Sequence, residues 1–160
     1  MIHVIFVPLI WWASLILLRT AVAKFSSDSL GLIATFTIYI FYAAYYLTLG
    51  DFLVAITYNV ILTGIFMHCN TFYTTYPDAW VWALLAKALG WWVQIAIGHN
   101  RLEGRKPALF DSLFDAIVMA PLFTWYEVLF FLGFKRDFKQ QLDAVVAKNI
   151  LALNRTRKTD

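Results

Sequence analysis

Long apolar runs separated by short polar stretches dominate the order of residues along the chain. The first four runs lie at residues 4–18, 30–49, 52–69 and 79–98, and each is too continuous for the alternating pattern of a membrane β-barrel strand. Helical runs of roughly 20 apolar residues match the thickness of a bilayer core. Because backbone amides inside lipid must be satisfied within the chain, this pattern predicts about four membrane-spanning helices.

The boundaries between these runs carry turn signals. The first run, residues 4–18, is shorter than a perpendicular span needs and has no cation before it, so we interpret it as a short first helix and not as a signal peptide. Gly50 and Asp51 separate the second and third runs and predict a tight helical hairpin. Residues 70–78 predict a polar loop, with Pro77 at the first turn of the fourth span.

The fifth apolar stretch, residues 113–134, differs from the others because Asp115, Pro121 and Glu127 interrupt it. We therefore expect a kinked or re-entrant segment and not a simple lipid-exposed span. After it, apolar residues recur at helical spacing among lysines and arginines, at Phe138, Leu142, Val145, Val146, Ile150 and Leu153. This spacing predicts an amphipathic helix at the membrane interface, with a basic end.

Composition supports a membrane protein. Hydrophobic residues make up 61% of the 160 residues and aromatic residues 18%, with a mean hydropathy of +0.67, values far outside those of soluble domains. The predicted fold class is an all-α integral membrane bundle, with a membrane domain at residues 1–134 and a basic amphipathic tail at residues 135–160. The single cysteine excludes a disulfide within the chain.

Cations predict how the chain lies in the membrane. If the fifth stretch is re-entrant, the loop with Arg101, Arg105 and Lys106 lies on the same side as the basic tail, and the positive-inside rule makes that side cytosolic. If the fifth stretch crosses the membrane, the tail instead joins Arg19 and Lys24. We favour the re-entrant arrangement, which places both the loop and the tail in the cytosol.

The densest polar cluster, residues 94–109, follows directly on the fourth run. His99 and Glu103 are four residues apart and share a face if the helix continues that far. Imidazole and carboxylate ligands with open coordination positions suit non-haem iron(II), and zinc fits the same ligand types. Arg101 and Arg105 flank this pair; they are candidate contacts for an anionic head group, or they only supply positive-inside charge.

The number of spans groups the three histidines. Four spans separate His3 from His99, so both should emerge on the same membrane face and are candidate ligands of one metal ion. His68 follows three spans and should lie on the opposite face, as a loop or interfacial histidine.

Two further features lie inside the runs. Lys87 falls near the middle of the fourth run, where a cation is costly unless it faces protein or water, and an inward-facing or snorkelling structural lysine explains it at least as well as a functional one. The second run holds a dense aromatic patch, which ordinary packing and interfacial anchoring explain better than an acyl channel does. Its members are Tyr39, Tyr42, Tyr45 and Tyr46.

The order of these residues resembles that of a known family. The chain carries, in order, Ile2-His3, Phe6-Val7-Pro8, Gln94, Gly98-His99, Glu103, Arg105, Pro107-Ala108-Leu109, Ala120-Pro121, Glu127 and Leu132-Gly133-Phe134. This series resembles the small membrane 2-hydroxy fatty acid dioxygenases of phytosphingosine degradation. The resemblance covers roughly residues 3–138 and is strongest over residues 90–134.

The resemblance implies an iron(II)-dependent, multi-pass enzyme of the endoplasmic reticulum membrane, which uses molecular oxygen to remove one carbon from a 2-hydroxy fatty acid, a form of fatty acid α-oxidation. The residues carried over are His3 and His99 as iron ligands, Gln94, Glu103 and Arg105 as catalytic residues, and Arg101 and Arg105 as contacts for the substrate. The implied partners are the fatty acid, molecular oxygen and the lipid bilayer. We expect no nucleic-acid partner.

The chain departs from the family pattern at its start. Family members usually carry a further segment, with another histidine and an asparagine, before the residue that matches His3, whereas this chain begins at Met1. Three explanations stay open: a shortened product with altered or missing activity, compensation by His68 or a carboxylate, or a natural start further upstream. The competing class of function is a non-catalytic lipid-binding or scaffolding membrane protein.

Overall fold

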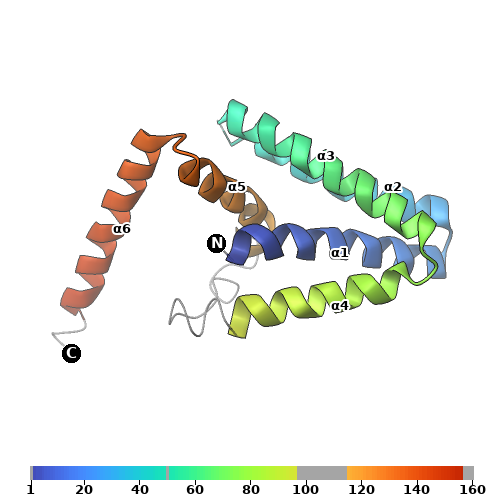
Figure 1. Cartoon of the computed structure of the whole chain (residues 1–160). Coiled ribbons are helices and arrows are strands. Elements are labelled where there is room, and N and C mark those ends of the chain that lie inside the picture. Colours follow the sequence, from blue (N-terminus) through green and yellow to red (C-terminus); the bar gives the residue numbers. More distant parts are fainter. Residues whose placement is uncertain (1, 50, 97–114, 157–160) are drawn as a thin grey trace. The chain divides into compact units, whose positions relative to one another are not determined.

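The computed structural model describes residues 2–49, 51–96 and 115–156, and within these ranges the secondary structure is helical with no strand (Figure 1). The helices are α1 (Ile2–Phe25), α2 (Asp28–Leu47), α3 (Phe52–Thr75), α4 (Ala79–Trp92), α5 (Ala120–Phe131) and α6 (Arg136–Thr156). Residues 93–96 extend α4 as a π-helical turn, and a second π-helical turn, η3 (Asp115–Met119), leads into α5.

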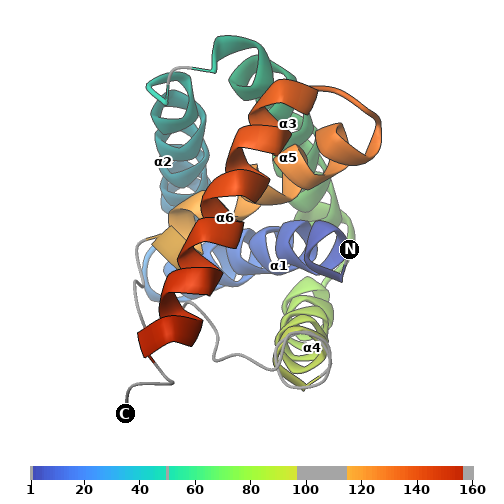
Figure 2. The same ribbon diagram turned by 90° about the vertical axis from the view of Figure 1, so that its left-hand side faces the viewer.

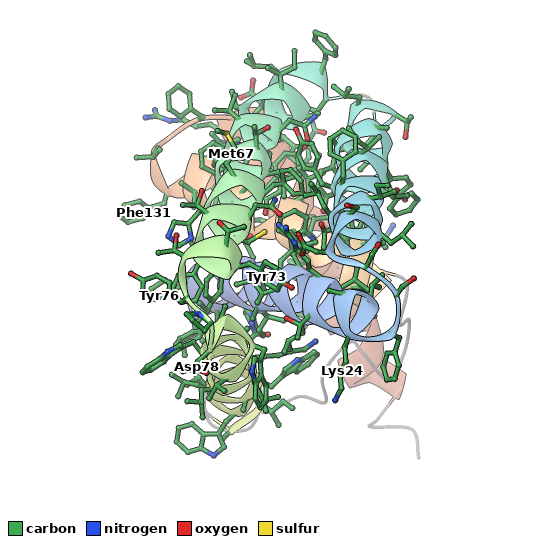
Figure 3. All side chains as sticks on the ribbon, turned by 90° about the vertical axis from the view of Figure 1, so that its right-hand side faces the viewer. Lys24, Met67, Tyr73, Tyr76, Asp78 and Phe131 are labelled. Atoms are coloured by element: carbon green, nitrogen blue, oxygen red, sulfur yellow. The ribbon has the colours of Figure 1, made fainter. Side chains whose placement is uncertain are left out.

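Four helices in the described part of the chain are long and apolar enough to cross a membrane. They are α1, α2, α3 and the stretch Ala79–Ala96, and a fifth span is reached only if α5 and α6 count together as one bent span. Large apolar side chains, Met67 among them, cover the outside of this bundle (Figure 3). The predicted all-α membrane bundle is therefore confirmed.

The chain forms two compact units, residues 1–125 and 126–160, so the division falls inside α5. In the first unit α1 packs against α2, α3 and α4, and α2 and α3 cross the direction of α1 (Figure 2). The predicted boundary between a membrane domain and a basic tail, at residue 134, is not tested by this division into compact units and stays a prediction.

Two predicted helix boundaries were wrong. The first helix is not short: α1 has 24 residues and continues past residue 18 to Phe25. Residues 70–75, predicted as part of a loop, belong to α3. Polar side chains continue these helices because they find partners inside the bundle. The Asn70 amide, for example, donates to the carbonyl oxygen of Phe66 at 2.8 Å.

A buried arginine joins the first three helices. Arg19 of α1 is only 5% exposed, and its guanidinium donates two hydrogen bonds to the Asp28 carboxylate of α2, at 3.0 and 2.8 Å. It donates a third to the Asn70 side chain of α3 at 2.6 Å and stacks over the Tyr73 ring at 4.3 Å (Figure 3). Such a bidentate pair fixes the orientation of the two side chains and also pairs their charges. The helices also approach closely here, because a Cβ on Gly31 would lie 2.8 Å from the Arg19 carbonyl oxygen.

Two tyrosines of α2 hold the start of α5. Tyr42 donates to the carbonyl oxygen of Ile117 at 3.1 Å, and Tyr46 donates to that of Val118 at 2.6 Å. Pro121, four residues after Ile117, has no N–H and cannot give the Ile117 carbonyl an α-helical hydrogen bond, so the Tyr42 hydroxyl adds a donor at this position. The fifth stretch is a π-helical turn followed by this proline, and the kink predicted for it stays a prediction. Its re-entrant course stays a prediction.

In the second unit, a sharp bend separates α5 from α6. Gly133, with φ +83°, ends α5 in a left-handed conformation, and the Phe134 N–H donates to the Leu129 carbonyl oxygen at 2.8 Å. The bend between the two helices measures 114°. Helix α6 confirms the predicted tail helix, and its apolar side chains are exposed: Phe138, Leu142, Val145, Val146 and Ile150.

Candidate functional site

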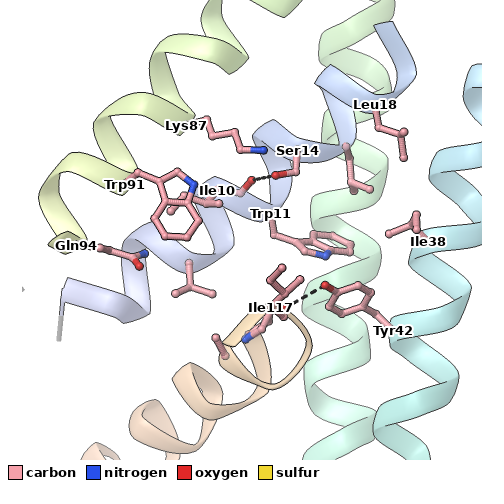
Figure 4. Close-up of a pocket in the computed structure, with 14 residues that line it drawn as sticks. Ile10, Trp11, Ser14, Leu18, Ile38, Tyr42, Lys87, Trp91, Gln94 and Ile117 are labelled. Carbon is pink, nitrogen blue, oxygen red and sulfur yellow. Dashed lines mark hydrogen bonds between the residues drawn. The ribbon is translucent and has the colours of Figure 1, made fainter. Parts of the chain in front are cut away.

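A cavity of about 360 Å³ lies inside the first unit (Figure 4). Side chains from α1, α2, α4 and the η3–α5 junction line it, and most of them are apolar. Its volume falls within the range of about 300–1,000 Å³ that is typical of small-molecule sites.

The cavity follows α1 for much of that helix. Its lining on α1 extends from Val7 to Leu18, which at 1.5 Å per residue is roughly 17 Å along the helix axis. Ile38 of α2 and Ile117 of η3 close other sides of the cavity. A long, mainly apolar cavity of this kind suits a ligand with an acyl chain.

Two polar groups in the lining are bonded to the backbone. The Ser14 hydroxyl donates to the Ile10 carbonyl oxygen at 2.7 Å, and the Tyr42 hydroxyl donates to the Ile117 carbonyl oxygen at 3.1 Å (Figure 4). These bonds satisfy the hydrogens of both hydroxyl groups. They also fix the walls of the cavity, because each ties a lining side chain to a helix backbone.

Three other lining side chains are donors without an acceptor among the described residues. Trp11 and Gln94 are each 7% exposed, and neither the Trp11 Nε1 nor the Gln94 Nε2 has a hydrogen-bond partner there. Lys87 is half-buried and lines the same cavity. Lys87 and Gln94 project from one face of the α4 segment, with Trp91 between them (Figure 4). The inward orientation anticipated for Lys87 is therefore confirmed.

The structure places two of the predicted site residues at one end of the bundle. Helices α1 and α4 run antiparallel, and Gly90 faces Ile10, whose Cγ1 would lie 2.7 Å from a Cβ at that glycine (Figure 1). Moving one turn toward the end of α4 brings Gln94 to the level of the first turn of α1, which carries His3. His3 also precedes Val7 by four residues and so projects from the cavity side of α1.

The remaining predicted site residues lie outside the described residues: His99, Arg101, Glu103 and Arg105. The described segments on either side of them both reach the cavity, through Gln94 before them and Ile117 after them. Among the residues that the structure does describe, no group of three or more His, Cys, Asp or Glu side chains could hold a metal ion.

His68 was predicted as a loop or interfacial histidine; the loop position is wrong, and the interfacial position stays a prediction. It lies within α3, where its Nδ1 accepts a hydrogen bond from the Trp12 indole at 3.0 Å and its ring stacks on Phe72. The error follows from the missed extension of α3 to Thr75. His68 lines a separate groove between α1 and α3, where Ile5 and Gly64 are its neighbours.

Sequence reasoning missed the lining residues Trp11 and Ser14, and for Tyr42 it preferred a packing role over lining an acyl channel. The packing itself is confirmed: the Tyr42 ring lies edge-on to Trp11 and to Tyr46, with centroids 5.6 and 5.9 Å apart. A single apolar run gives no signal for which of its faces lines a cavity, because all its faces are apolar. Spacing from His3 would have found Val7 and Ser14, which lie four and eleven residues further along α1.

The described chain thus defines a multi-span helical membrane protein with an elongated, mostly apolar cavity inside one helical unit. A family model described as 2-hydroxy-palmitic acid dioxygenase Mpo1-like matches residues 1–132, and the chain belongs to this family. It is 32% identical over 143 residues to the 2-hydroxy-palmitic acid dioxygenase MPO1 of Saccharomyces cerevisiae, a match that covers 89% of this chain and 77% of that protein. No solved structure matches the chain.

Proposed function

We propose that this protein is a membrane dioxygenase that uses molecular oxygen to shorten a long-chain 2-hydroxy fatty acid by one carbon. The family match and the name of the yeast relative support this class of reaction. The observation that carries the proposal is the cavity, because its apolar lining from Val7 to Leu18 suits an acyl chain and opens along the face of α1 that also carries His3.

Iron(II) is the proposed cofactor, with His3 and His99 as its ligands. Imidazole is a donor that iron(II) accepts, and His3 lies at the same end of the bundle as Gln94. The described residues do not form a complete metal site by themselves, so the proposed ligand set depends on residues between positions 97 and 114. When bound, iron(II) would supply the activation of molecular oxygen.

The chain's own residues would bind and orient the substrate. The apolar lining of the cavity would hold the acyl tail and exclude water from it, since burying apolar surface is favourable. The Gln94 amide would donate a hydrogen bond to an oxygen of the substrate head group. Glu103 and Arg105 are proposed as further catalytic residues, and Arg101 and Arg105 as contacts for the carboxylate.

The proposal also includes a location. We place the protein in the endoplasmic reticulum membrane, in the degradation of phytosphingosine, with residues 94–109 and the tail on the cytosolic side. The positive-inside rule supports this orientation if the fifth stretch is re-entrant. Glycosylation of an engineered acceptor site in the tail, in cells, would contradict it.

Conversion of 2-hydroxypalmitate by purified, iron(II)-loaded protein in detergent, with and without oxygen, tests this function. We expect a product one carbon shorter that requires oxygen and is lost in His3→Ala and in His99→Ala, each with less bound iron. His68→Gln is the matched control, because His68 does not line the cavity and glutamine still offers Trp12 a hydrogen-bond acceptor. This variant should retain turnover. Well-folded, iron-loaded protein without any product would instead favour a lipid-binding or scaffolding protein.

A further inference from the structure

The polar part of the cavity lining offers donors that lack acceptors. Trp11 Nε1 can only donate a hydrogen bond, the Gln94 Nε2 can only donate, and the Lys87 ammonium is a cation with three donors. None of these three groups has an acceptor among the described residues. The described lining includes no Asp or Glu side chain that would neutralise Lys87.

This arrangement is unfavourable for the protein alone. A buried donor without an acceptor loses its bonds to water and gains nothing in return, and a cation within a membrane span needs a partner or a watery cavity. Trp11 and Gln94 are both more than nine-tenths buried. The lining is therefore complementary to an anionic group that accepts several hydrogen bonds.

Lys87 and Gln94 project from the same face of the α4 segment toward the cavity, where both can reach one small head group (Figure 4). Lys87 and Gln94 are seven residues apart, which is two turns or roughly 11 Å along the helix axis. The four-carbon stem of a lysine is flexible and can carry its ammonium along the helix toward Gln94. The Lys87 side chain points toward α1, whereas the Trp11 ring extends from α1 toward Tyr42 and away from Lys87 and Gln94 (Figure 4).

We propose that Lys87, together with Gln94, binds the carboxylate of a fatty acid inside the cavity, with Lys87 as its counter-charge in place of Arg101 and Arg105. The choice of a fatty acid as the ligand rests on the proposed function. The choice of a carboxylate as the bound group rests on the hydrogen-bond donors and the cation in the lining. In this arrangement the whole fatty acid, including its head group, lies inside the bundle. The apolar residues around the donors hold its tail. Lys87 is thus a determinant of specificity for acids over neutral lipids of the same length.

Binding without turnover tests this proposal. The full chain, free of iron and kept without oxygen in phosphatidylcholine nanodiscs, is titrated with palmitic acid and with hexadecanol, which share chain length and differ in charge. We expect the wild-type protein to prefer the acid by roughly tenfold to a hundredfold, the range of a charge-assisted hydrogen bond. Lys87→Met should abolish this preference by weakening binding of the acid, and it should leave binding of the alcohol within about twofold.

Matched variants separate charge from other effects. Lys87→Arg keeps a cation and should restore most of the preference, whereas Lys24→Met removes an exposed cation of α1 that does not line the cavity and should change nothing. Trp11→Phe removes an N–H that points toward Tyr42 and away from Lys87, so it should leave the preference for the acid unchanged. A Lys87→Met or Lys87→Gln protein that keeps the full preference for the acid overturns the proposal, as does a wild-type protein without such a preference.

The same titrations distinguish this proposal from the proposed function. Lys87-dependent preference for the acid, without any product in the turnover assay, would leave the carboxylate site standing and refute the dioxygenase. Turnover by the wild-type protein, with an acid preference that survives Lys87→Met, would support the dioxygenase and refute the carboxylate site at Lys87.

Discussion

The hydroxyl of Tyr42 supplies the Ile117 carbonyl with a hydrogen bond that Pro121 cannot supply. It donates to the Ile117 carbonyl oxygen at 3.1 Å, and the residue four positions later is Pro121, which has no N–H. Tyr42→Phe keeps the ring that packs against Trp11 but removes this donor. Because Tyr42 is only 6% exposed, water does not readily take the place of the hydroxyl.

The expected magnitude follows from the state of the carbonyl group. The bond is only partly buried, so Tyr42→Phe should lower the free energy of unfolding by the net worth of one hydrogen bond, about 1–1.5 kcal/mol. Pro121→Ala restores an N–H four residues after Ile117, which a regular helical turn can direct at the same carbonyl. In that background Tyr42→Phe should cost less than about 1 kcal/mol, a coupling of the size known for contacting residues.

The assay is unfolding of purified protein in mixed micelles by titration with sodium dodecyl sulfate. Cys69 is the single cysteine and is buried, so its reaction with a fluorogenic thiol reagent reports unfolding directly. Tyr39→Phe is the control, because its hydroxyl pairs with the Thr63 hydroxyl at 2.8 Å, and its cost should be the same with or without the proline. An equal cost of Tyr42→Phe in both backgrounds would refute the proposed role of the hydroxyl.

The other predictions concern helix contacts and use the same titration. Gly31→Ala should lower the free energy of unfolding by about 1–3 kcal/mol, since its Cβ would lie 2.8 Å from a backbone oxygen. Gly64→Ala meets open space, so it should leave the free energy of unfolding unchanged or raise it by up to about 1 kcal/mol. Equal effects of the two variants would contradict this contrast. Asp28→Ala should cost about 1–3 kcal/mol by leaving the buried Arg19 without its carboxylate. Asp143→Ala breaks only an exposed pair on α6 and should cost less than about 0.5 kcal/mol, so a similar loss in both variants would show that burial is unimportant.

The spans could be predicted from hydropathy, but two of their ends could not. Hydropathy locates apolar runs correctly because a span must be apolar over most of its length. It places the helix ends too early at Arg19 and at Asn70, since charged and polar residues normally mark the end of a span. In the structure these two side chains bond to each other across α1 and α3, at 2.6 Å. A pairing between separate runs is invisible when each run is judged by itself.

The candidate site was predictable in part. Counting spans placed His3 and His99 on the same membrane face, and in the structure the start of α1 and the end of the α4 segment, which carries Gln94, lie at one end of the bundle (Figure 1). The outcome for His99 lies outside the described residues and stays a prediction. The cavity could not be predicted, because Trp11 and Leu18 belong to a run that is apolar on every face, and only packing decides which face meets lipid and which meets a ligand.

Helix α1 couples the stability of the bundle to the geometry of the candidate site. Arg19 must face Asp28 near one end of α1, and Ile10 must fit against Gly90 at its middle. A slip by one residue would turn α1 by 100° and break both contacts, because an α-helix has 3.6 residues per turn. The same register sets the direction of Trp11 into the cavity. The contacts that anchor α1 are therefore also the contacts that orient the site.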